Sequence, residues 1–363
     1  MTAPTRDDPL HDGPLDDAIE AVCAAVRAAT AVVPVGGRTH WEVGGPAPAG
    51  TEVVAPAGIV EYDPAELTVT LGAGTRVGDL DAVLAASGQQ CPLDPRHPTA
   101  TVGGVLATGL SGTRRLRYGP VRNRLLEVHL VTGDGRRVKG GGRTVKNVSG
   151  YDVARLVVGS LGTLGVIVQV TLRCEPRPPA SAWLTTERPG AEAAAAAFRP
   201  ATILVQPGTT TVLVEGHPDD IAAETTRLDA RPAAGPPRLP QGPFRGRISV
   251  SPARVDTVVA EATRIGIGAV GEGGVGTVHV AAPTAESLRA ARAIAHGAGG
   301  WLLRETGGVG EVDGFGVALP NRAVMARIKD ALDPAGVCNP GRLPLHDRPL
   351  TSVDPAAGRG FDA

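Results

Sequence analysis

Three glycine-rich segments of the sequence could bind a diphosphate through the peptide backbone. They are residues 34–40 (PVGGRTH), 101–112 (TVGGVLATGLSG) and 159–167 (GSLGTLGVI). A diphosphate attracts several donors at once, and successive peptide N–H groups can converge on it where glycines leave no Cβ in the way. One such segment could be a simple tight turn. Because three follow in order, each beside an expected strand, we interpret them as ligand-binding turns, with hydroxyl donors from Thr39, Thr101, Thr108, Ser111 and Thr163.

The usual nucleotide-binding motifs do not explain these segments. The sequence has no GxxxxGK[ST] motif, in which a lysine reaches the phosphates. It also has no GxGxxG that opens a long helix with an acidic residue about 20 positions later. A dinucleotide bound by a different fold therefore remains the favoured interpretation.

Composition excludes several classes of function. The 36 basic and 37 acidic side chains give a formal net charge of −1, which does not suit binding to nucleic acid. No segment approaches the roughly 20 apolar residues of a membrane-spanning helix, and residues 1–14 do not read as a signal or transit peptide. The four cysteines are never spaced as CxxC, so we expect free thiols, no metal site and a cytoplasmic protein: Cys23, Cys91, Cys174 and Cys338.

The elements that position the glycine segments form an expected α+β domain over residues 15–177. The periodic pattern of apolar residues ends at the linker 175–179 (EPRPP). Most of residues 89–119 show no such pattern and are expected to be rich in turns. The patterns predict helices at 15–30, 75–88 and 151–158, strands at 67–71, 126–130 and 166–172, and a hairpin turn at 133–135.

A second α+β domain is expected over residues 178–330. A return segment at 331–345 follows it, and residues 1–14 and 346–363 are expected to be flexible. Within this second domain the patterns predict strands at 202–206, 211–215, 246–250, 276–281 and 301–305, and helices at 219–228, 252–264 and 285–296, packed on one face of the sheet.

Residues 33–176 resemble the PCMH-type FAD-binding domain of the vanillyl-alcohol-oxidase and D-lactate-dehydrogenase superfamily, in particular the FAD-binding subunits of bacterial glycolate oxidases. The motifs that carry the resemblance are the three glycine segments, PLDP at 92–95, VKNVSGYD at 145–152, and DPAGVCNPGR at 333–342. The resemblance implies a two-subdomain PCMH-type FAD-binding domain followed by an α+β, ferredoxin-like cap domain.

The resemblance also implies roles for individual residues around a non-covalent FAD. The diphosphate loop would comprise Val35, Gly36, Gly37, Arg38, Thr39 and His40. The phosphates, ribityl chain and flavin edge would be lined by Thr101, Val102, Gly103, Gly104, Thr108 and Ser111, and the adenosine end by Gly162, Thr163, Gly165 and Ile167. Asp94, Tyr118, Lys146, Asn147 and Asn339 would lie near the flavin. His40 is displaced from the position that carries covalent flavin in some members.

The catalytic residues are not assigned by the resemblance. Catalytic members carry a signature similar to HxHxGDGN, and residues 271–283 (GEGGVGTVHVAAP) retain only His279, which also reads as a structural histidine in a strand. The remaining candidates are Arg304, Tyr118 and Lys146, with Arg245 and Arg247 as further arginines that could bind a carboxylate. The run Arg114, Arg115 and Arg117 could hold phosphate or a partner's acidic face, or be solvated.

Three functions therefore stay open. The chain could be the FAD-binding subunit of a complex that oxidises a small 2-hydroxy acid to a 2-oxo acid, with a second flavoprotein subunit and an iron–sulfur subunit as partners. In that case it would transfer electrons or hold the complex together, and its partners could attach it to a membrane. It could instead be a stand-alone FAD-dependent 2-hydroxy-acid dehydrogenase, or a non-redox nucleotide-binding module.

Overall fold

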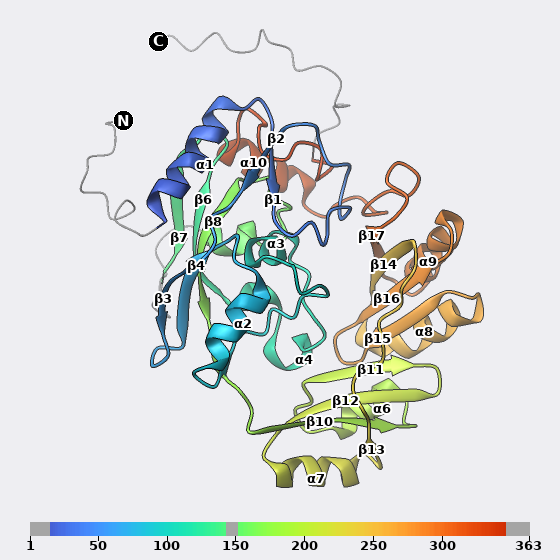
Figure 1. The fold of residues 1–363 in the computed structure, drawn as a ribbon. Coiled ribbons are helices and arrows are strands. Elements are labelled where there is room, and N and C mark those ends of the chain that lie inside the picture. The colour runs from blue at the N-terminus through green and yellow to red at the C-terminus, as the bar shows by residue number, and fades with distance from the viewer. Residues whose placement is uncertain (1–14, 143–151, 346–363) are drawn as a thin grey trace.

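The structure is a computed structural model that describes residues 15–142 and 152–345. The first part of the chain forms a five-stranded antiparallel sheet in the order β3-β4-β8-β6-β7 (Figure 1). The strands are β3 (Ile59–Asp63), β4 (Thr68–Gly72), β6 (Leu125–Val131), β7 (Arg137–Gly141) and β8 (Val166–Arg173). All but the last residue of β8 are buried, because it lies between β4 and β6 in the middle of the sheet. The predicted strands and hairpin of this domain are confirmed.

Helix α1 (Asp16–Ala28) packs beside a small parallel pair, β1 (Val32–Val35) and β2 (Thr51–Val54). Its buried residues recur at helical spacing: Ile19, Val22, Cys23 and Val26. Asp16 and Asp17 lie in its first turn, where negative charge favours the N-terminal end of the helix dipole. These features explain why the sequence predicted this helix to within two residues of each end.

The turn-rich segment contains short helices that the sequence pattern did not predict. Helix α3 (Val102–Thr108) begins at Thr101, whose hydroxyl oxygen accepts a hydrogen bond from the Gly104 N–H at 3.2 Å. Two glycines in its first turn lower the intrinsic helix propensity and hid it from the pattern. Helix α4 (Arg115–Tyr118), a 3-10 turn (Val121–Asn123) and the short pair β5 (Gln89–Gln90) and β9 (Glu175–Pro176) were not predicted either. Helices α2 (Val77–Ala85) and α5 (Val153–Val157) confirm the helices predicted at 75–88 and 151–158.

The second part of the chain forms an eight-stranded antiparallel sheet, which we call the cap. The strand order is β13-β10-β12-β11-β15-β16-β14-β17. The strands are β10 (Ala180–Thr186), β11 (Thr202–Gln206), β12 (Thr209–Gly216), β13 (Arg231–Pro232), β14 (Phe244–Ser249), β15 (Gly268–Glu272), β16 (Thr277–Ala282) and β17 (Trp301–Thr306). The helices are α6 (Gly190–Ala196), α7 (Pro218–Arg227), α8 (Val255–Arg264, after a 3-10 turn at Pro252–Arg254) and α9 (Ala285–Gly297).

All five predicted cap strands and the three predicted helices are present, but strands β10, β13 and β15 and helix α6 were missed. In β15 the sequence GAVGE places glycine at two of five positions, which weakens the strand signal. The whole of β16 is buried, because the sheet packs against α8 and α9 on one side and faces the first domain on the other.

The chain finally returns from the cap to the first domain. Helix α10 (Arg322–Leu332), also missed by the pattern, lies near α1 and β1, at the end of the molecule remote from β10–β13 (Figure 1). Cys338 forms a parallel bridge with Val32 of β1. The expected limit of the cap at residue 330 thus falls within a helix that contacts the first domain, since Lys329 donates to the Thr163 carbonyl at 2.7 Å.

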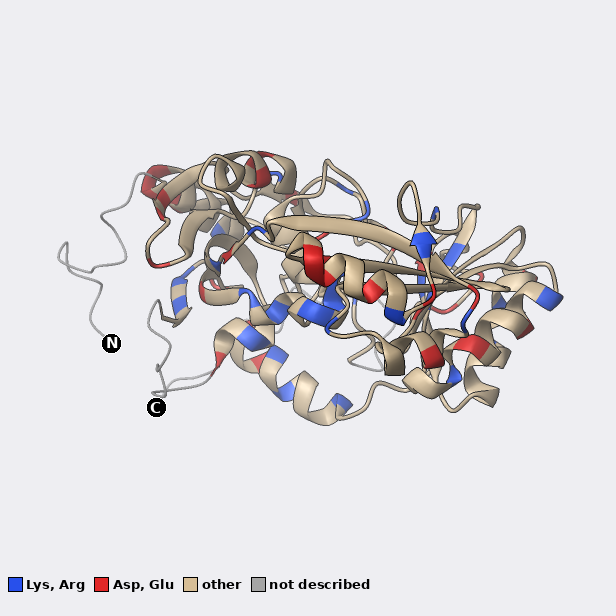
Figure 2. Cartoon of the chain, turned by 90° about the horizontal axis from the view of Figure 1, so that it is seen from below, with Lys and Arg blue, Asp and Glu red and all other residues tan. Residues whose placement is uncertain are grey.

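Basic and acidic residues are interspersed over both parts of the chain in the view from below (Figure 2). Among the described residues, none of the helices combines the length and the apolar character needed to traverse a bilayer.

Candidate functional site

The three glycine segments meet at one cleft in the first domain. Two adjoining cavities share Pro34, Gly36, Thr101, Gly104 and Ala107, and so form one continuous cleft. Of the cofactor residues expected from the resemblance, those that line it are Val35, Gly36, Gly37, Arg38, Thr39, His40, Thr101, Gly103, Gly104, Thr108, Gly162, Gly165, Ile167 and Asn339. Residues far apart in the sequence therefore converge on one elongated site.

The cleft offers hydrogen-bonding groups that the chain itself leaves unused. Within the described residues, the amide N–H groups of Gly37, Arg38, Thr39 and His40 have no hydrogen-bond acceptor. The buried Oδ1 atom of Asn339 also lacks a partner there, although its Nδ2 donates to the Leu161 carbonyl at 2.6 Å. Buried polar groups are normally paired, so the unpaired Asn339 Oδ1 fits a donor on a ligand. The four amides lie on an exposed to half-buried turn, where they are free to bind the acceptor oxygens of a diphosphate.

Two glycines of the first turn are required by close packing against the second glycine segment. A Cβ on Gly36 would lie 2.2 Å from the Thr101 Oγ1, and one on Gly37 would lie 2.0 Å from the Thr99 carbonyl oxygen. Gly104 differs, because a Cβ there would meet only the Thr101 Oγ1, at 3.1 Å, and would otherwise project toward the cleft. Gly104 is thus the position where added side-chain volume would occupy ligand space.

Four of the expected cofactor residues do not line the cleft. Val102 is fully buried in the core. The hydroxyl of Thr163 donates to the Ser160 carbonyl at 2.7 Å, and that of Ser111 accepts the Val121 N–H at 3.1 Å. Asp94 forms an ion pair with Arg114 at 2.5 Å. Thr108 does line the cleft, but its hydroxyl donates to the carbonyls of its own helix. Thus fewer hydroxyls than expected can serve a ligand, because short polar side chains near turns bond to the local backbone.

Tyr118 lines a different cavity, at the seam between the two parts of the chain. Its hydroxyl donates to Glu215 Oε2 of the cap at 2.5 Å and accepts a hydrogen bond from Gln90 at 3.1 Å. Burial and the bond to Glu215 raise the pKa of Tyr118 to about 12. Tyr118 thus ties the cap to the first domain as a neutral phenol. The remaining catalytic candidate from the first domain, Lys146, lies outside the described residues, as does Asn147.

A charged cluster lies where the cap approaches the cleft. Glu305 on β17 pairs with Arg247 of β14 at 3.1 Å and with Arg96 of the first domain at 3.4 Å. His40 at the cleft edge makes an edge-to-face contact with His97, with ring centroids 6.5 Å apart. Arg96, His97 and Glu305 were not predicted as site residues, although the basic pair Arg96-His97 directly after PLDP is a signal that could have identified two of them.

The cap residues considered for catalysis are mostly bonded within the chain. His279 is buried and its Nε2 lies 2.6 Å from Glu272 Oε1 on the neighbouring strand. Arg304 is buried too, and donates to the carbonyls of Gly44 and Gly307 at 2.8 and 3.2 Å. Arg247 binds Glu305 and the Ser111 carbonyl. Of the three arginines proposed for a carboxylate, only Arg245 has no acidic partner among the described residues.

His40 supplies a testable pH dependence. Its burial, as the largest cause, lowers the pKa of His40 to about 4, so folding favours the neutral ring. Between pH 6.5 and 4 the unfolded chain binds the proton more readily, and stability falls as the pH falls. We expect His40→Gln to reduce the loss of unfolding free energy on acidification through this window by on the order of 2 kcal/mol. Urea unfolding at several pH values measures this difference, and parallel curves for both proteins would contradict it.

Several cleft residues were not assigned roles from the sequence. Trp41 and Arg342 both line it, and the Arg342 guanidinium lies 5.3 Å from the Trp41 ring centroid while donating to the Trp41 carbonyl. Ala73 and Gly74 line the other end, directly after β4. The GAG sequence at 72–74 follows a predicted strand, so a fourth glycine turn could have been recognised.

No group of three or more histidine, cysteine or acidic side chains in the described part of the chain is arranged to hold a metal ion. All four cysteines are buried free thiols. Burial raises the pKa of Cys174 and of Cys338 to about 12, which makes both poor metal ligands at neutral pH.

Residues 15–141 match the family model described as an FAD binding domain. The first part of the chain is therefore an FAD-binding domain, which confirms the resemblance drawn from its glycine motifs. The cleft described above lies in this domain, and two of its three glycine segments begin within the matched residues.

The chain is also similar in sequence to curated proteins that are named as oxidoreductases of 2-hydroxy acids. The chain is 40% identical over 172 residues to glycolate oxidase subunit GlcE of Escherichia coli K12, a match that covers 47% of this chain and 49% of that protein. It is 42% identical over 118 residues to a D-lactate dehydrogenase of Archaeoglobus fulgidus, covering 32% and 27%. It is 35% identical over 175 residues to a D-2-hydroxyglutarate dehydrogenase of Xanthomonas citri, covering 46% and 37%. The matches thus span about half or less of each relative.

A solved structure supports the fold over a longer range. The structure of an alkyldihydroxyacetonephosphate synthase superposes with a TM-score of 0.63, covering 89% of this chain and 73% of that one at 16% sequence identity. The agreement includes the cap, where no sequence motif was available, and concerns the fold alone.

Proposed function

We propose that this chain is the FAD-binding subunit of a complex that oxidises a 2-hydroxy acid, of the glycolate oxidase or D-lactate dehydrogenase type. The observation that carries the proposal is the convergence of the glycine segments and Asn339 on one cleft with unused backbone donors. When bound, FAD accepts a hydride from a hydroxy acid and passes its electrons on. The relatives named as glycolate oxidase subunit, D-lactate dehydrogenase and D-2-hydroxyglutarate dehydrogenase support this reaction class.

In this proposal the N–H groups of residues 37–40 hold the diphosphate without a dedicated cation. Arg38, the basic residue of that turn, is paired with Glu52 at 2.6 Å and stacks on Trp41 at 4.4 Å. Its charge is thus already shared with a carboxylate. Gly104 leaves space for the ribityl chain, and Asn339 from the C-terminal return offers its unpaired Oδ1 to a donor on the cofactor.

The cap favours a subunit over a stand-alone enzyme. A stand-alone dehydrogenase would need a base for the substrate hydroxyl and a cation for its carboxylate. His279 is buried against Glu272, and Arg247 and Arg304 are bonded within the chain. We therefore propose that this chain transfers electrons or stabilises the complex, while a second flavoprotein subunit and an iron–sulfur subunit complete the reaction.

The same proposal includes the finer architecture and the location of the protein. We propose a two-subdomain PCMH-type domain over residues 15–177 and a ferredoxin-like cap that begins at residue 178 and ends before α10, with the eight-stranded sheet and its helices in support. The complex would lie in the cytoplasm, with any membrane attachment made through partners.

One observation favours the alternative of a stand-alone 2-hydroxy-acid dehydrogenase. Arg245 lies beside the charged cluster of the cap and, among the residues that the structure describes, donates only to Thr306 and Gln241, so its guanidinium could bind a substrate carboxylate. His40 and His97 nearby would then be the candidate bases.

Reduction of the bound flavin distinguishes the two functions. We expect the purified chain to retain FAD, and glycolate and D-lactate to leave its flavin absorbance unchanged until the co-purifying subunits are added. The variant His279→Ala should then leave reduction by the complex within about twofold of wild type, because the ring is bonded inside the cap. Bleaching by the isolated chain, abolished in Arg245→Gln, would instead establish the stand-alone dehydrogenase. A chain that takes up no FAD would refute both.

A further inference from the structure

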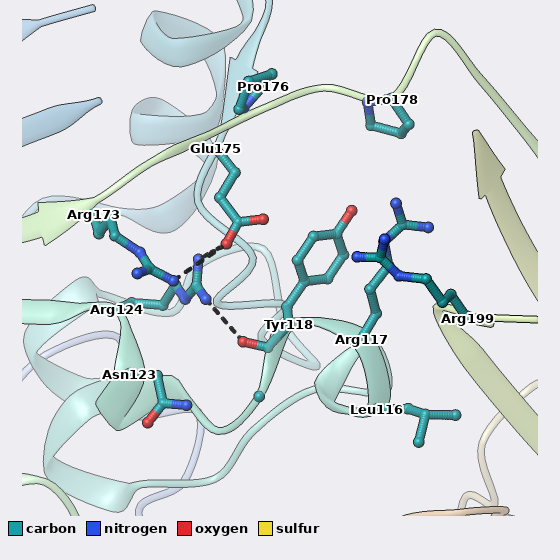
Figure 3. Close-up of a pocket in the computed structure, with 11 residues that line it drawn as sticks. Leu116, Arg117, Tyr118, Asn123, Arg124, Arg173, Glu175, Pro176, Pro178 and Arg199 are labelled. Atoms are coloured by element: carbon teal, nitrogen blue, oxygen red, sulfur yellow. Dashed lines mark hydrogen bonds and ion pairs between the residues drawn. The ribbon is translucent and has the colours of Figure 1, made fainter. Parts of the chain in front are cut away.

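A second cavity, of about 500 Å³, opens at the seam between the FAD-binding domain and the cap (Figure 3). Its walls come from α4, from the end of β8, from the linker at Glu175, Pro176 and Pro178, and from Arg199 of the cap. None of its lining residues lines the flavin cleft. We call this cavity the seam pocket.

The seam pocket contains four arginines and a single carboxylate among its lining residues. The arginines are Arg117, Arg124, Arg173 and Arg199, and the carboxylate is Glu175. Several guanidinium groups gathered in one concave site repel one another unless anions compensate them. Such a gathering is therefore explained best by an anionic ligand.

On one side of the pocket, two arginines share the one carboxylate. Arg124 has a side chain only 3% exposed and forms an ion pair with Glu175. Its NH2 donates to the Tyr118 carbonyl at 2.9 Å, but its buried Nε has no partner in the described residues. Arg173 is 51% exposed and lies 3.6 Å from the same Glu175 oxygen. One negative charge thus serves two guanidinium groups, and Arg173 keeps exposed donors without a protein acceptor.

On the other side, the arginines come from both domains. Figure 3 shows Arg117 and Arg199 on one side of the Tyr118 ring, and Arg124 and Arg173 on the other. Arg117 donates to the Glu215 carbonyl at 2.7 Å and lies 3.9 Å from the Glu215 carboxylate, which also accepts the Tyr118 hydroxyl. Arg199 is exposed and has neither a hydrogen-bond acceptor nor an acidic partner within the described residues. Its charge is the least compensated of the four.

We propose that the seam pocket binds a small polyanion bearing carboxylate or phosphate groups, and that this ligand ties the cap to the FAD-binding domain. Guanidinium groups bind such oxyanions with paired, charge-assisted hydrogen bonds. The pocket volume lies in the range of small-molecule sites. A ligand between Arg199 and the Arg124–Arg173 pair would bridge the linker, so its binding stabilises the contact between the domains.

Calorimetric titration of the FAD-loaded protein with citrate and, separately, with inorganic phosphate tests the proposal. We expect saturable binding of at least one probe, weakened at high salt. Arg173→Gln and Arg199→Gln should each weaken it about tenfold or more, because each removes charged hydrogen bonds. The preference between the probes identifies a polycarboxylate or a phosphate compound as the natural source.

The matched control is Arg136→Gln, an exposed arginine on the β6–β7 turn, which should bind the probe as wild type does. Unchanged FAD content in every variant shows that folding and the flavin cleft are preserved. The proposal is overturned if neither probe binds, or if all variants bind alike. It is likewise overturned if neither wild type nor any variant binds the small anions, while Arg173→Gln and Arg199→Gln fail to associate with a partner subunit. The pocket would then receive an acidic protein side chain.

Discussion

Gly104→Leu is expected to abolish FAD retention while the chain still folds. A side chain at this position has only the Thr101 Oγ1 near its Cβ, so it would extend into the cleft rather than into the core. Leucine is also a better helix former than glycine by about 0.5–1 kcal/mol, which favours α3. We expect at least a hundredfold loss of FAD affinity, measured by the flavin absorbance of the purified protein and by titration of the apoprotein with FAD.

A second glycine in a helix provides the control for this experiment. Gly297, the last residue of α9 in the cap, has no atom within 4 Å of an added Cβ. Gly297→Leu should therefore retain FAD fully. If Gly104→Leu and Gly297→Leu both bind FAD with wild-type affinity, the cofactor does not pass Gly104 in the cleft. Gly36→Leu is less informative, since its Cβ would collide with Thr101 and could prevent folding.

Asp333→Asn is expected to destabilise the protein by about 3–5 kcal/mol, because it breaks a buried ion pair. Asp333 is 1% exposed and pairs with Lys329. Its two carboxylate oxygens accept the N–H groups of Val337 and Cys338 at 2.9 and 2.7 Å. An amide can replace only one of these acceptors and leaves the Lys329 charge buried without a counter-charge. Asn339 follows Cys338 directly in the chain, so it should also lose its position in the cleft, and FAD affinity should fall.

Urea unfolding and FAD titration of two further variants isolate the cause. The double variant Lys329→Met with Asp333→Asn removes both charges, so it should recover part of the lost stability. Glu20→Gln breaks only the exposed pair with Arg27 and should cost less than about 1 kcal/mol. If Asp333→Asn unfolds at the same urea concentration as wild type, the C-terminal return is not held by this pair.

The local sequence determined the secondary structure wherever the spacing of apolar residues and the intrinsic propensities favoured the same element. Helix α1 was predicted because its apolar residues recur at helical spacing, and strand β8 because apolar residues alternate along it at Val166, Val168, Val170 and Leu172. Helix α3 was missed because glycines needed for close approach oppose its propensity. Strand β15 was missed for a similar reason, since glycine favours turns in the pattern while the neighbouring strands supply its hydrogen bonds.

The chemical character of the site was also readable from the sequence. Glycines 36, 37 and 162 lie in turns and glycines 103 and 104 in the first turn of α3, and their motifs predicted an FAD-binding domain that the family match confirms. Backbone donors need no particular side chain, only a chain that bends without a Cβ, and that property is local. For this reason the type of ligand could be inferred before the fold was known.

Only the tertiary structure decided which side chains remain free to act. The hydroxyls of Thr163 and Ser111 form hydrogen bonds with nearby backbone groups. Tyr118 is hydrogen-bonded to Glu215, and His279 to Glu272. Tyr118 and Glu215 lie 97 residues apart in the sequence, so no spacing rule could anticipate their bond. The bonds of Thr163, Ser111 and His279 join residues close in the sequence, but the folded backbone and sheet register bring those particular groups together. The charge balance of the seam pocket arises in the same way, because it depends on which residues the packing of the cap brings against the first domain. Packing is set by the whole chain, and the availability of a charged or hydroxyl side chain follows from it.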